Sequence, residues 1–167
     1  MSDLITYSST QELSPQALER LFLSIGWESG KYPEKLSLAM KNYKSVFTAW
    51  DGEKLVGLVS AMDDGVLTAY VHYLLVDPDY QKHGIGRKLM EMIKERYADY
   101  KKICLIAESD AIKFYETCGF VKVETAKPMY FWDKRLAERC NYTAFRLFLC
   151  VILIFRKSVQ GLLWQPA

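Results

Sequence analysis

The middle of the chain holds three apolar runs that are joined only by short Asp-Gly turns, at about residues 46–50, 55–62 and 66–76. Asp-Gly between apolar runs is a strong hairpin signal, because both residues tolerate the positive φ angles of tight hairpin turns. The segment therefore predicts three consecutive antiparallel strands. Pro78 is expected to end the third strand, since proline has no N–H to donate to a sheet. The chain must fold around this antiparallel meander.

A strand and two helices are expected before the meander. Residues 4–9 alternate weakly between apolar and polar side chains and indicate a strand. Residues 15–25 show helical apolar spacing, with Ser14 suited to the N-cap and Gly26 to the helix end. A second, shorter helix is predicted over residues 33–43.

Helices and strands also alternate after the meander. Residues 85–97 have an amphipathic pattern that is typical of a surface helix. A short apolar strand is expected at 102–108, followed by a helix that Ser109 or Asp110 would cap and Gly119 would end. Two final strands are predicted at 120–124 and 128–132.

This order of elements predicts an α+β fold with a mixed, mostly antiparallel sheet flanked by helices. A chain of 167 residues, 50% of them apolar, can bury one sizeable core. We expect the folded domain to cover residues 1–132. Residues 133–167 form an atypical apolar and basic tail.

Two glycines connect the third strand to the long helix, in the stretch YQKHGIGRKL at residues 80–89. The first turn of a helix has backbone N–H groups without partners, and together with the helix dipole they attract anions. Glycine lets a phosphate approach the backbone, and Lys82, Arg87 and Lys88 add positive charge. The stretch fits neither the P-loop nor the dinucleotide fingerprint. Alone, it predicts either a pyrophosphate site or a loop that merely turns the chain.

Two motifs resemble signatures of the GNAT superfamily of N-acetyltransferases. VDPDYQKHGIGRKLM resembles the acyl-CoA-binding motif Q/R-x-x-G-x-G/A, with Gln81, Gly84 and Gly86 at the defined positions. AIKFYETCGF resembles the second signature, an aromatic pair before Gly-Phe. The resemblance covers roughly residues 4–132. The segments KYPEKLSLAMKNY, LTAYVHYLLVDPDYQ and IAESDAIKFYETCGF are further similar to plant serotonin (arylalkylamine) N-acetyltransferases and their bacterial relatives.

The resemblance implies direct acetyl transfer from acetyl-CoA, as co-substrate, to a primary amine. In the family, the helix start holds the pyrophosphate and the strand edge pairs with the pantetheine amides. A backbone N–H near Leu75 would polarise the thioester carbonyl. The acetyl-CoA-binding residues implied by the resemblance are Leu74, Leu75, Val76, Gln81, Lys82, His83, Gly84, Ile85, Gly86, Arg87 and Lys88.

The resemblance also suggests catalytic side chains. Tyr115 matches the family's tyrosine that protonates the CoA sulfur, and a phenol of pKa about 10 has its proton at neutral pH. The plant-like relatives have an aspartate where this chain has Tyr73, which leaves the base open between Tyr73 and His72. Strand alternation predicts that His72 and Tyr73 lie on opposite faces. Glu28 is a third candidate.

The acceptor pocket is expected between the first two helices and the central strands. Its candidate lining residues are Trp27, Tyr32, Tyr70 and Tyr130, whose rings would suit a flat, apolar small-molecule amine. Two alternatives stay open. One is acetylation of a protein or peptide, and the other is an acyl-CoA-binding module that has lost catalysis.

Composition bears on the remaining partners. A net charge of +2 gives no global reason for nucleic-acid binding, and none is expected. The cysteines and histidines lack metal-ligand spacing, so no metal is expected. The N-terminus lacks a secretory pattern, which predicts a cytoplasmic protein. The tail is a candidate capping helix, homodimer contact, membrane-surface segment or non-native terminus; its apolar run at 147–155 is too short to span a bilayer, and membrane contact is not expected.

Overall fold

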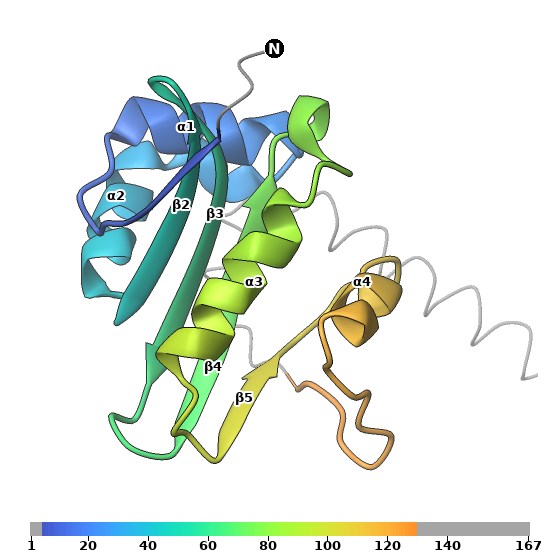
Figure 1. Cartoon of the computed structure of the whole chain (residues 1–167). Coiled ribbons are helices and arrows are strands. Elements are labelled where there is room, and N and C mark those ends of the chain that lie inside the picture. Colours follow the sequence, from blue (N-terminus) through green and yellow to red (C-terminus); the bar gives the residue numbers. More distant parts are fainter. Residues whose placement is uncertain (1–4, 130–167) are drawn as a thin grey trace, which may run out of the picture. The chain divides into compact units, whose positions relative to one another are not determined.

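A computed structural model describes residues 5–129 of the chain. These residues form a five-stranded sheet with helices on both faces (Figure 1). In chain order the elements are β1 (Thr6–Ser9), α1 (Pro15–Ser24), the 3-10 turn η1 (Glu28–Lys31), α2 (Pro33–Asn42), β2 (Ser45–Asp51), β3 (Lys54–Asp63), β4 (Thr68–Val76), the 3-10 turn η2 (Pro78–Tyr80), α3 (Ile85–Arg96), β5 (Lys102–Leu105) and α4 (Ile112–Thr117).

The sheet keeps the chain order β1-β2-β3-β4-β5. Strands β1 to β4 pair antiparallel, whereas β4 and β5 pair in parallel. The predicted α+β fold with a mixed, mostly antiparallel sheet is therefore confirmed. The two Asp-Gly turns contain Gly52 at φ 55° and Gly65 at φ 87°, a left-handed conformation that glycine adopts without a steric cost.

Strand β4 begins at Thr68, two residues later than predicted. The Asp64 carboxylate accepts hydrogen bonds from the N–H groups of Val66, Leu67 and Thr68 at 2.7–3.0 Å. These N–H groups, that of Leu67 most of all, lower the pKa of Asp64 to about 2. The carboxylate thereby holds the first residues of the apolar run in the turn rather than in the strand.

Helices α1 and α2 cover one face of the sheet. The Ser14 hydroxyl accepts a hydrogen bond from the Ala17 N–H at 3.2 Å, which confirms the predicted N-cap. Gly26 follows the end of α1 at φ 75°, also as predicted. The buried cluster on this face joins the two helices to β3 and β4, and its largest fully buried members include Leu18, Leu21, Phe22, Met40, Leu55 and Leu58.

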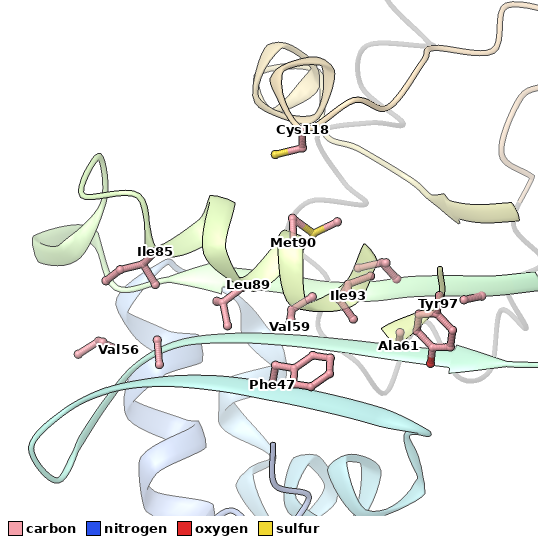
Figure 2. Close-up of a cluster of buried hydrophobic side chains, with 13 residues drawn as sticks. Phe47, Val56, Val59, Ala61, Ile85, Leu89, Met90, Ile93, Tyr97 and Cys118 are labelled. Atoms are coloured by element: carbon pink, nitrogen blue, oxygen red, sulfur yellow. The ribbon is translucent and has the colours of Figure 1, made fainter. Parts of the chain in front are cut away.

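Helix α3 lies along the other face of the sheet (Figure 1). In Figure 2, Ile85 and Leu89 of α3 and Val59 of β3 lie in this cluster, where the helix packs on the strands. Gly57 on β3 allows the close approach, because a Cβ there would lie only 3.0 Å from Ile85 Cγ2 and 3.3 Å from Leu89 Cδ1. The first turns of α3 are therefore packed directly on the sheet.

Replacing Gly57 with alanine should destabilise the domain by about 1–3 kcal/mol, because the added methyl group must push the first turn of α3 off the sheet. Urea unfolding measures this loss. Met62→Ala on the same strand is the control, since Met62 is exposed and its truncation should cost about 0.5 kcal/mol or less. Equal midpoints for Gly57→Ala and the wild type would show that α3 does not depend on this contact.

Helix α4 begins later than predicted. Its N-cap is Ala111, without a side-chain hydrogen bond, so the predicted cap by Ser109 or Asp110 is wrong. Those two residues instead belong to a preceding turn, which the Ala111 N–H closes by donating to the Glu108 carbonyl at 3.0 Å. Gly119 follows the helix at φ 90°, as predicted.

The predicted strand at 120–124 is wrong. Val121 and Val123 are 85% and 61% exposed, and no strand of the described region pairs with this segment. Alternating apolar residues do not make a strand without a neighbouring strand to bond. The strand predicted at 128–132 is also not seen at Pro128 and Met129, and its remainder, like the tail from 133 onward, lies outside the described residues. No helix within residues 5–129 is long and apolar enough to cross a membrane.

Candidate active site

A cavity of about 620 Å³ opens where the end of β4, the loop after it, the start of α3 and helix α4 meet. Most of the predicted acetyl-CoA-binding residues line it, namely Leu74, Leu75, Val76, Gln81, Lys82, Gly84, Ile85, Gly86 and Arg87. His83 and Lys88 do not line it. The structure adds Tyr80, Asp110, Ala111 and Phe114, which sequence reasoning missed.

The loop between β4 and α3 is anchored by Asp77, the aspartate of the VDP stretch. Its side chain is buried, accepts a hydrogen bond from the Asp79 N–H at 3.1 Å, and pairs with the Lys54 ammonium at 2.9 Å. Its own N–H donates to the Val56 carbonyl at 2.8 Å. These bonds fix where the loop leaves the sheet, and with it one wall of the cavity.

Two further side chains tie this loop down. The Tyr80 hydroxyl donates to Asp51 Oδ2 at 2.8 Å, and the Lys54 ammonium lies 4.7 Å from the Tyr80 ring centroid. Gln81 Nε2 donates to the Val76 carbonyl at 3.1 Å, across the end of the strand. The Gln81 side chain therefore bonds to the protein's own backbone, so the glutamine of the family motif has a structural role in this chain.

The start of α3 leaves its backbone donors open toward the cavity. Gly84 occupies the N-cap at φ 82°, and no side chain caps the helix. At Gly86, a Cβ would lie 3.3 Å from Phe114 Cζ, so glycine lets α4 approach the first turn of α3. A helix start with uncapped N–H groups beside a cavity is suited to bind an anion.

Two cationic side chains of α3 donate hydrogen bonds to the end of α4. The Arg87 guanidinium donates to the Thr117 carbonyl at 3.2 Å and to the Thr117 hydroxyl at 3.3 Å. The Lys94 ammonium donates to the Cys118 carbonyl at 3.0 Å. Arg87 thus lines the cavity, but some of its guanidinium N–H groups already donate to Thr117. The Lys88 ammonium lies 3.9 Å from the Glu91 carboxylate.

Tyr115 and Phe114 both line the cavity from α4. Burial and, to a smaller extent, the nearby Cys118 thiol together raise the pKa of Tyr115 to about 12. The phenol therefore carries its proton throughout the physiological pH range and is able to donate it.

Strand β4 contains a bulge at His72. Ser60 pairs with Tyr73 and Ala61 pairs with Val71, which leaves His72 as an extra residue on β4. The prediction that His72 and Tyr73 lie on opposite faces is therefore wrong, because the bulge breaks the alternation. Their rings instead stack, with centroids 4.2 Å apart and planes inclined by 20°.

Aromatic side chains gather around Tyr73 on the α1 and α2 face. The ring centroids of Phe22, Trp27 and Tyr43 lie 5.1, 5.8 and 6.1 Å from that of Tyr73. Phe22 and Tyr43 are members that sequence reasoning missed. We call Phe22, Trp27, Tyr43, Tyr70, His72 and Tyr73 the aromatic cluster; Tyr70 joins it through His72, with centroids 6.0 Å apart.

The other candidates stand apart from this cluster or outside the described region. Tyr32 is 44% exposed, and its ring contacts the Lys35 ammonium, 5.1 Å from the centroid. The Glu28 carboxylate pairs with the Lys31 ammonium at 2.8 Å. Tyr130 lies outside the described residues. Among residues 5–129 no three His, Cys, Asp or Glu side chains gather in a way that could hold a metal ion.

A family model described as the acetyltransferase (GNAT) domain matches residues 10–129. The chain belongs to the GNAT acetyltransferase family. The matched range contains both sequence motifs and every element that lines the cavity.

Similar proteins support this membership. The uncharacterised N-acetyltransferase ycf52 of Porphyra purpurea is 32% identical over 135 residues, which cover 77% of this chain and 76% of that protein. GCN5-related N-acetyltransferase 2, chloroplastic, of Arabidopsis thaliana is 31% identical over 153 residues, which cover 78% of this chain and 59% of that protein. Histone acetyltransferase TAP1 of Glycine max is 29% identical over 129 residues, which cover 70% of this chain and 55% of that protein.

Solved structures share the fold. A GNAT-family acetyltransferase from Streptococcus pneumoniae superposes with a TM-score of 0.69 at 26% identity, covering 78% of this chain and 99% of that protein. This GNAT protein is accordingly an N-acetyltransferase. Its predicted cytoplasmic location stays a prediction, and the name of the Arabidopsis relative places that protein in the chloroplast.

Proposed function

We propose that this GNAT acetyltransferase binds acetyl-CoA in the cavity at the start of α3 and transfers the acetyl group to the primary amine of a small molecule. The observation that carries the proposal is the uncapped start of α3, with glycine at 84 and 86, opening on the same cavity as Leu74–Val76 and Tyr115.

The residues present fit the co-substrate. Uncapped N–H groups and the positive end of the α3 dipole suit a pyrophosphate, and the Lys82 side chain at the cavity adds a cation. Glycine at 84 and 86 places no side chain between a ligand and these donors. The cavity volume lies within the range of about 300–1,000 Å³ that is usual for small-molecule sites.

The reaction forms a C–N bond to the acceptor amine and breaks the C–S bond of the thioester, so the amine loses a proton and the departing sulfur gains one. Tyr115 is the proposed donor of the second proton, because its phenol lines the cavity and keeps its proton at neutral pH. The backbone of β4 next to Leu75 is the proposed contact of the reacting carbonyl.

The aromatic cluster supports a flat, apolar acceptor. Trp27 and Tyr73 lie in this cluster and are only partly buried. Rings of this kind favour an aromatic or alkyl amine through stacking and apolar contact. This agrees with the resemblance to arylalkylamine acetyltransferases, which remains a prediction for this chain.

A second candidate is acetylation of a protein lysine. One specific observation favours it, namely the similarity to a Glycine max protein named as a histone acetyltransferase. The aromatic cluster favours a small aromatic amine, because its rings offer flat, apolar contacts that a lysine side chain does not need.

The test is a screen of acceptors with acetyl-CoA, with free CoA as the readout and mass spectrometry of each product. One arm holds arylalkylamines and alkylamines, and the other holds lysine-containing histone peptides. We expect N-acetylated arylalkylamines and little peptide product. Preferential acetylation of the peptides would replace the first candidate with the second. Binding of acetyl-CoA without turnover in either arm would indicate a module without catalysis.

A further inference from the structure

Helix α4 (Ile112–Thr117) carries Tyr115, the proposed proton donor, but has little of its own to hold it in place. It is six residues long, and none of its residues is buried. Its N-cap, Ala111, forms no side-chain hydrogen bond. Helices of this length are not stable in water by themselves. The placement of the Tyr115 hydroxyl therefore depends on what α4 contacts.

Two cations of α3 bind the carbonyl end of α4. The Arg87 guanidinium donates from Nη1 to the Thr117 carbonyl and from Nη2 to the Thr117 hydroxyl, at 3.2 and 3.3 Å. Two turns further along α3, the Lys94 ammonium donates to the Cys118 carbonyl at 3.0 Å. Positive charge at this end of a helix is also favoured by the helix dipole. Charged side chains of α3 thus fix the end of α4.

Thr117 links Arg87 to the residues of α4 that line the cavity. Its hydroxyl accepts from Arg87 and donates to the Phe114 carbonyl at 2.7 Å. The Phe114 ring lies against the first turn of α3, where a Cβ at Gly86 would be 3.3 Å from Phe114 Cζ. The centroids of the Phe114 and Tyr115 rings are 5.2 Å apart. A shift of Thr117 would therefore move the Tyr115 ring.

Arg87 also lines the cavity, three residues after the N-cap glycine of α3. A guanidinium has five N–H groups in one plane, and the bonds to Thr117 use two of them. The other three are suited to a phosphate, which arginine binds through two parallel hydrogen bonds. One guanidinium is therefore able to bond to a pyrophosphate and to the end of α4 at the same time.

We propose that Arg87 is a positioning residue that couples acetyl-CoA binding to the placement of Tyr115, by bonding to the pyrophosphate and to Thr117 at once. This rests on the proposed function. In the free protein the bonds from Arg87 to Thr117 are exposed, so water competes for them. A bound pyrophosphate holds the guanidinium by charge-assisted hydrogen bonds, which are about twice as strong as neutral ones. The end of α4, and Tyr115 with it, is then held more firmly than in the free protein.

The first test uses steady-state kinetics of the full chain. Thr117→Val keeps the shape of the side chain but removes the hydroxyl that accepts from Arg87, so kcat should fall about 5-fold with little change in the KM for acetyl-CoA. Thr117→Ser keeps the hydroxyl and should retain the wild-type kcat. Because Thr117 acts through Tyr115, Thr117→Val should have no further effect on kcat in a Tyr115→Phe background. A wild-type kcat in Thr117→Val, or an equal loss in both backgrounds, would overturn the proposal.

Arg87→Met removes both contacts at once. It should raise the KM for acetyl-CoA about 10-fold and also lower kcat about 5-fold, because it loses a charged bond to the pyrophosphate and the bonds to α4. Lys113→Met removes an exposed cation of α4 itself and is the matched control, which should change neither constant. A raised KM with the wild-type kcat would make Arg87 a phosphate contact only and would refute the coupling.

The second test reads α4 without any acceptor, by amide hydrogen exchange of the full chain with and without saturating acetyl-CoA. The Cys118 N–H donates to the Tyr115 carbonyl at 3.0 Å. The Gly119 N–H donates to the Glu116 carbonyl at 2.9 Å. Neither Cys118 nor Gly119 lines the cavity, so these two amides report the end of α4 rather than contact with the ligand.

We expect acetyl-CoA to slow the exchange of both amides about 5-fold in the wild type, and to leave it unchanged in Arg87→Met saturated with acetyl-CoA. Equal slowing in the two proteins would overturn the proposal. If calorimetry detects no binding of acetyl-CoA, the proposed function fails. Binding that leaves the exchange of the wild-type amides unchanged would refute the coupling alone.

Discussion

Gly84→Asp is expected to abolish the stabilisation of the domain by acetyl-CoA and to raise the KM for acetyl-CoA by about 100-fold or more. Gly84 is the N-cap of α3, so the new carboxylate would lie at the proposed pyrophosphate position. Two like charges about 4 Å apart near a protein surface repel by about 4 kcal/mol, which accounts for a loss of this size. The shift of the melting temperature by added acetyl-CoA measures the loss, because a ligand stabilises only a protein that binds it.

Gly84→Asn is the matched control. Asparagine and aspartate have the same shape, both tolerate the left-handed conformation at φ 82°, and both are able to cap a helix. Gly84→Asn should lose far less affinity for acetyl-CoA than Gly84→Asp. The asparagine side chain can compete for the N–H groups of α3, but it adds no charge that repels the pyrophosphate. If both variants keep wild-type stabilisation by acetyl-CoA, the anion site lies elsewhere. Equal large losses in both would point to the backbone conformation rather than to charge.

Tyr115→Phe should lower kcat by about 100-fold or more and leave the KM for acetyl-CoA nearly unchanged. General acid catalysis by a positioned side chain contributes about 10²–10⁴-fold, and removing the hydroxyl removes only the proton donor. The ring stays in the cavity wall beside Phe114 and Phe120, so binding should survive. Steady-state kinetics with the best acceptor measure the effect.

Tyr7→Phe serves as the control for Tyr115→Phe, because Tyr7 packs against the same core but lies on β1, away from the cavity. It should keep wild-type kcat. A Tyr115→Phe enzyme within about twofold of the wild-type kcat would assign the proton to another donor. An equal loss in both variants would indicate damage to the shared core.

The fold was largely predictable because its strongest signals are local. Ser14 caps α1, and glycine in the two Asp-Gly turns adopts the positive φ that their hairpins require. The segment at 120–124 has an equally good local pattern but no described partner strand. Pairing is a property of the folded sheet, so local alternation could not decide it.

The candidate site was predictable along the backbone and less so in its side-chain contacts. The two motifs bring Gly84, Gly86 and Tyr115 to one cavity, as the resemblance implied. The bulge at His72 reverses the predicted face of that ring, and nothing in the alternation of β4 signals it. Tyr43 and the bond from Arg87 to Thr117 depend on contacts about 30 residues apart, which no local spacing encodes.

Calorimetric titration of the full chain with acetyl-CoA tests the central claim most directly, because every role proposed for the cavity depends on that binding. The account predicts saturable binding of one acetyl-CoA per chain, competed by free CoA and lost in Gly84→Asp. Absence of binding by the wild-type chain would contradict it, and so would binding that Gly84→Asp leaves unchanged.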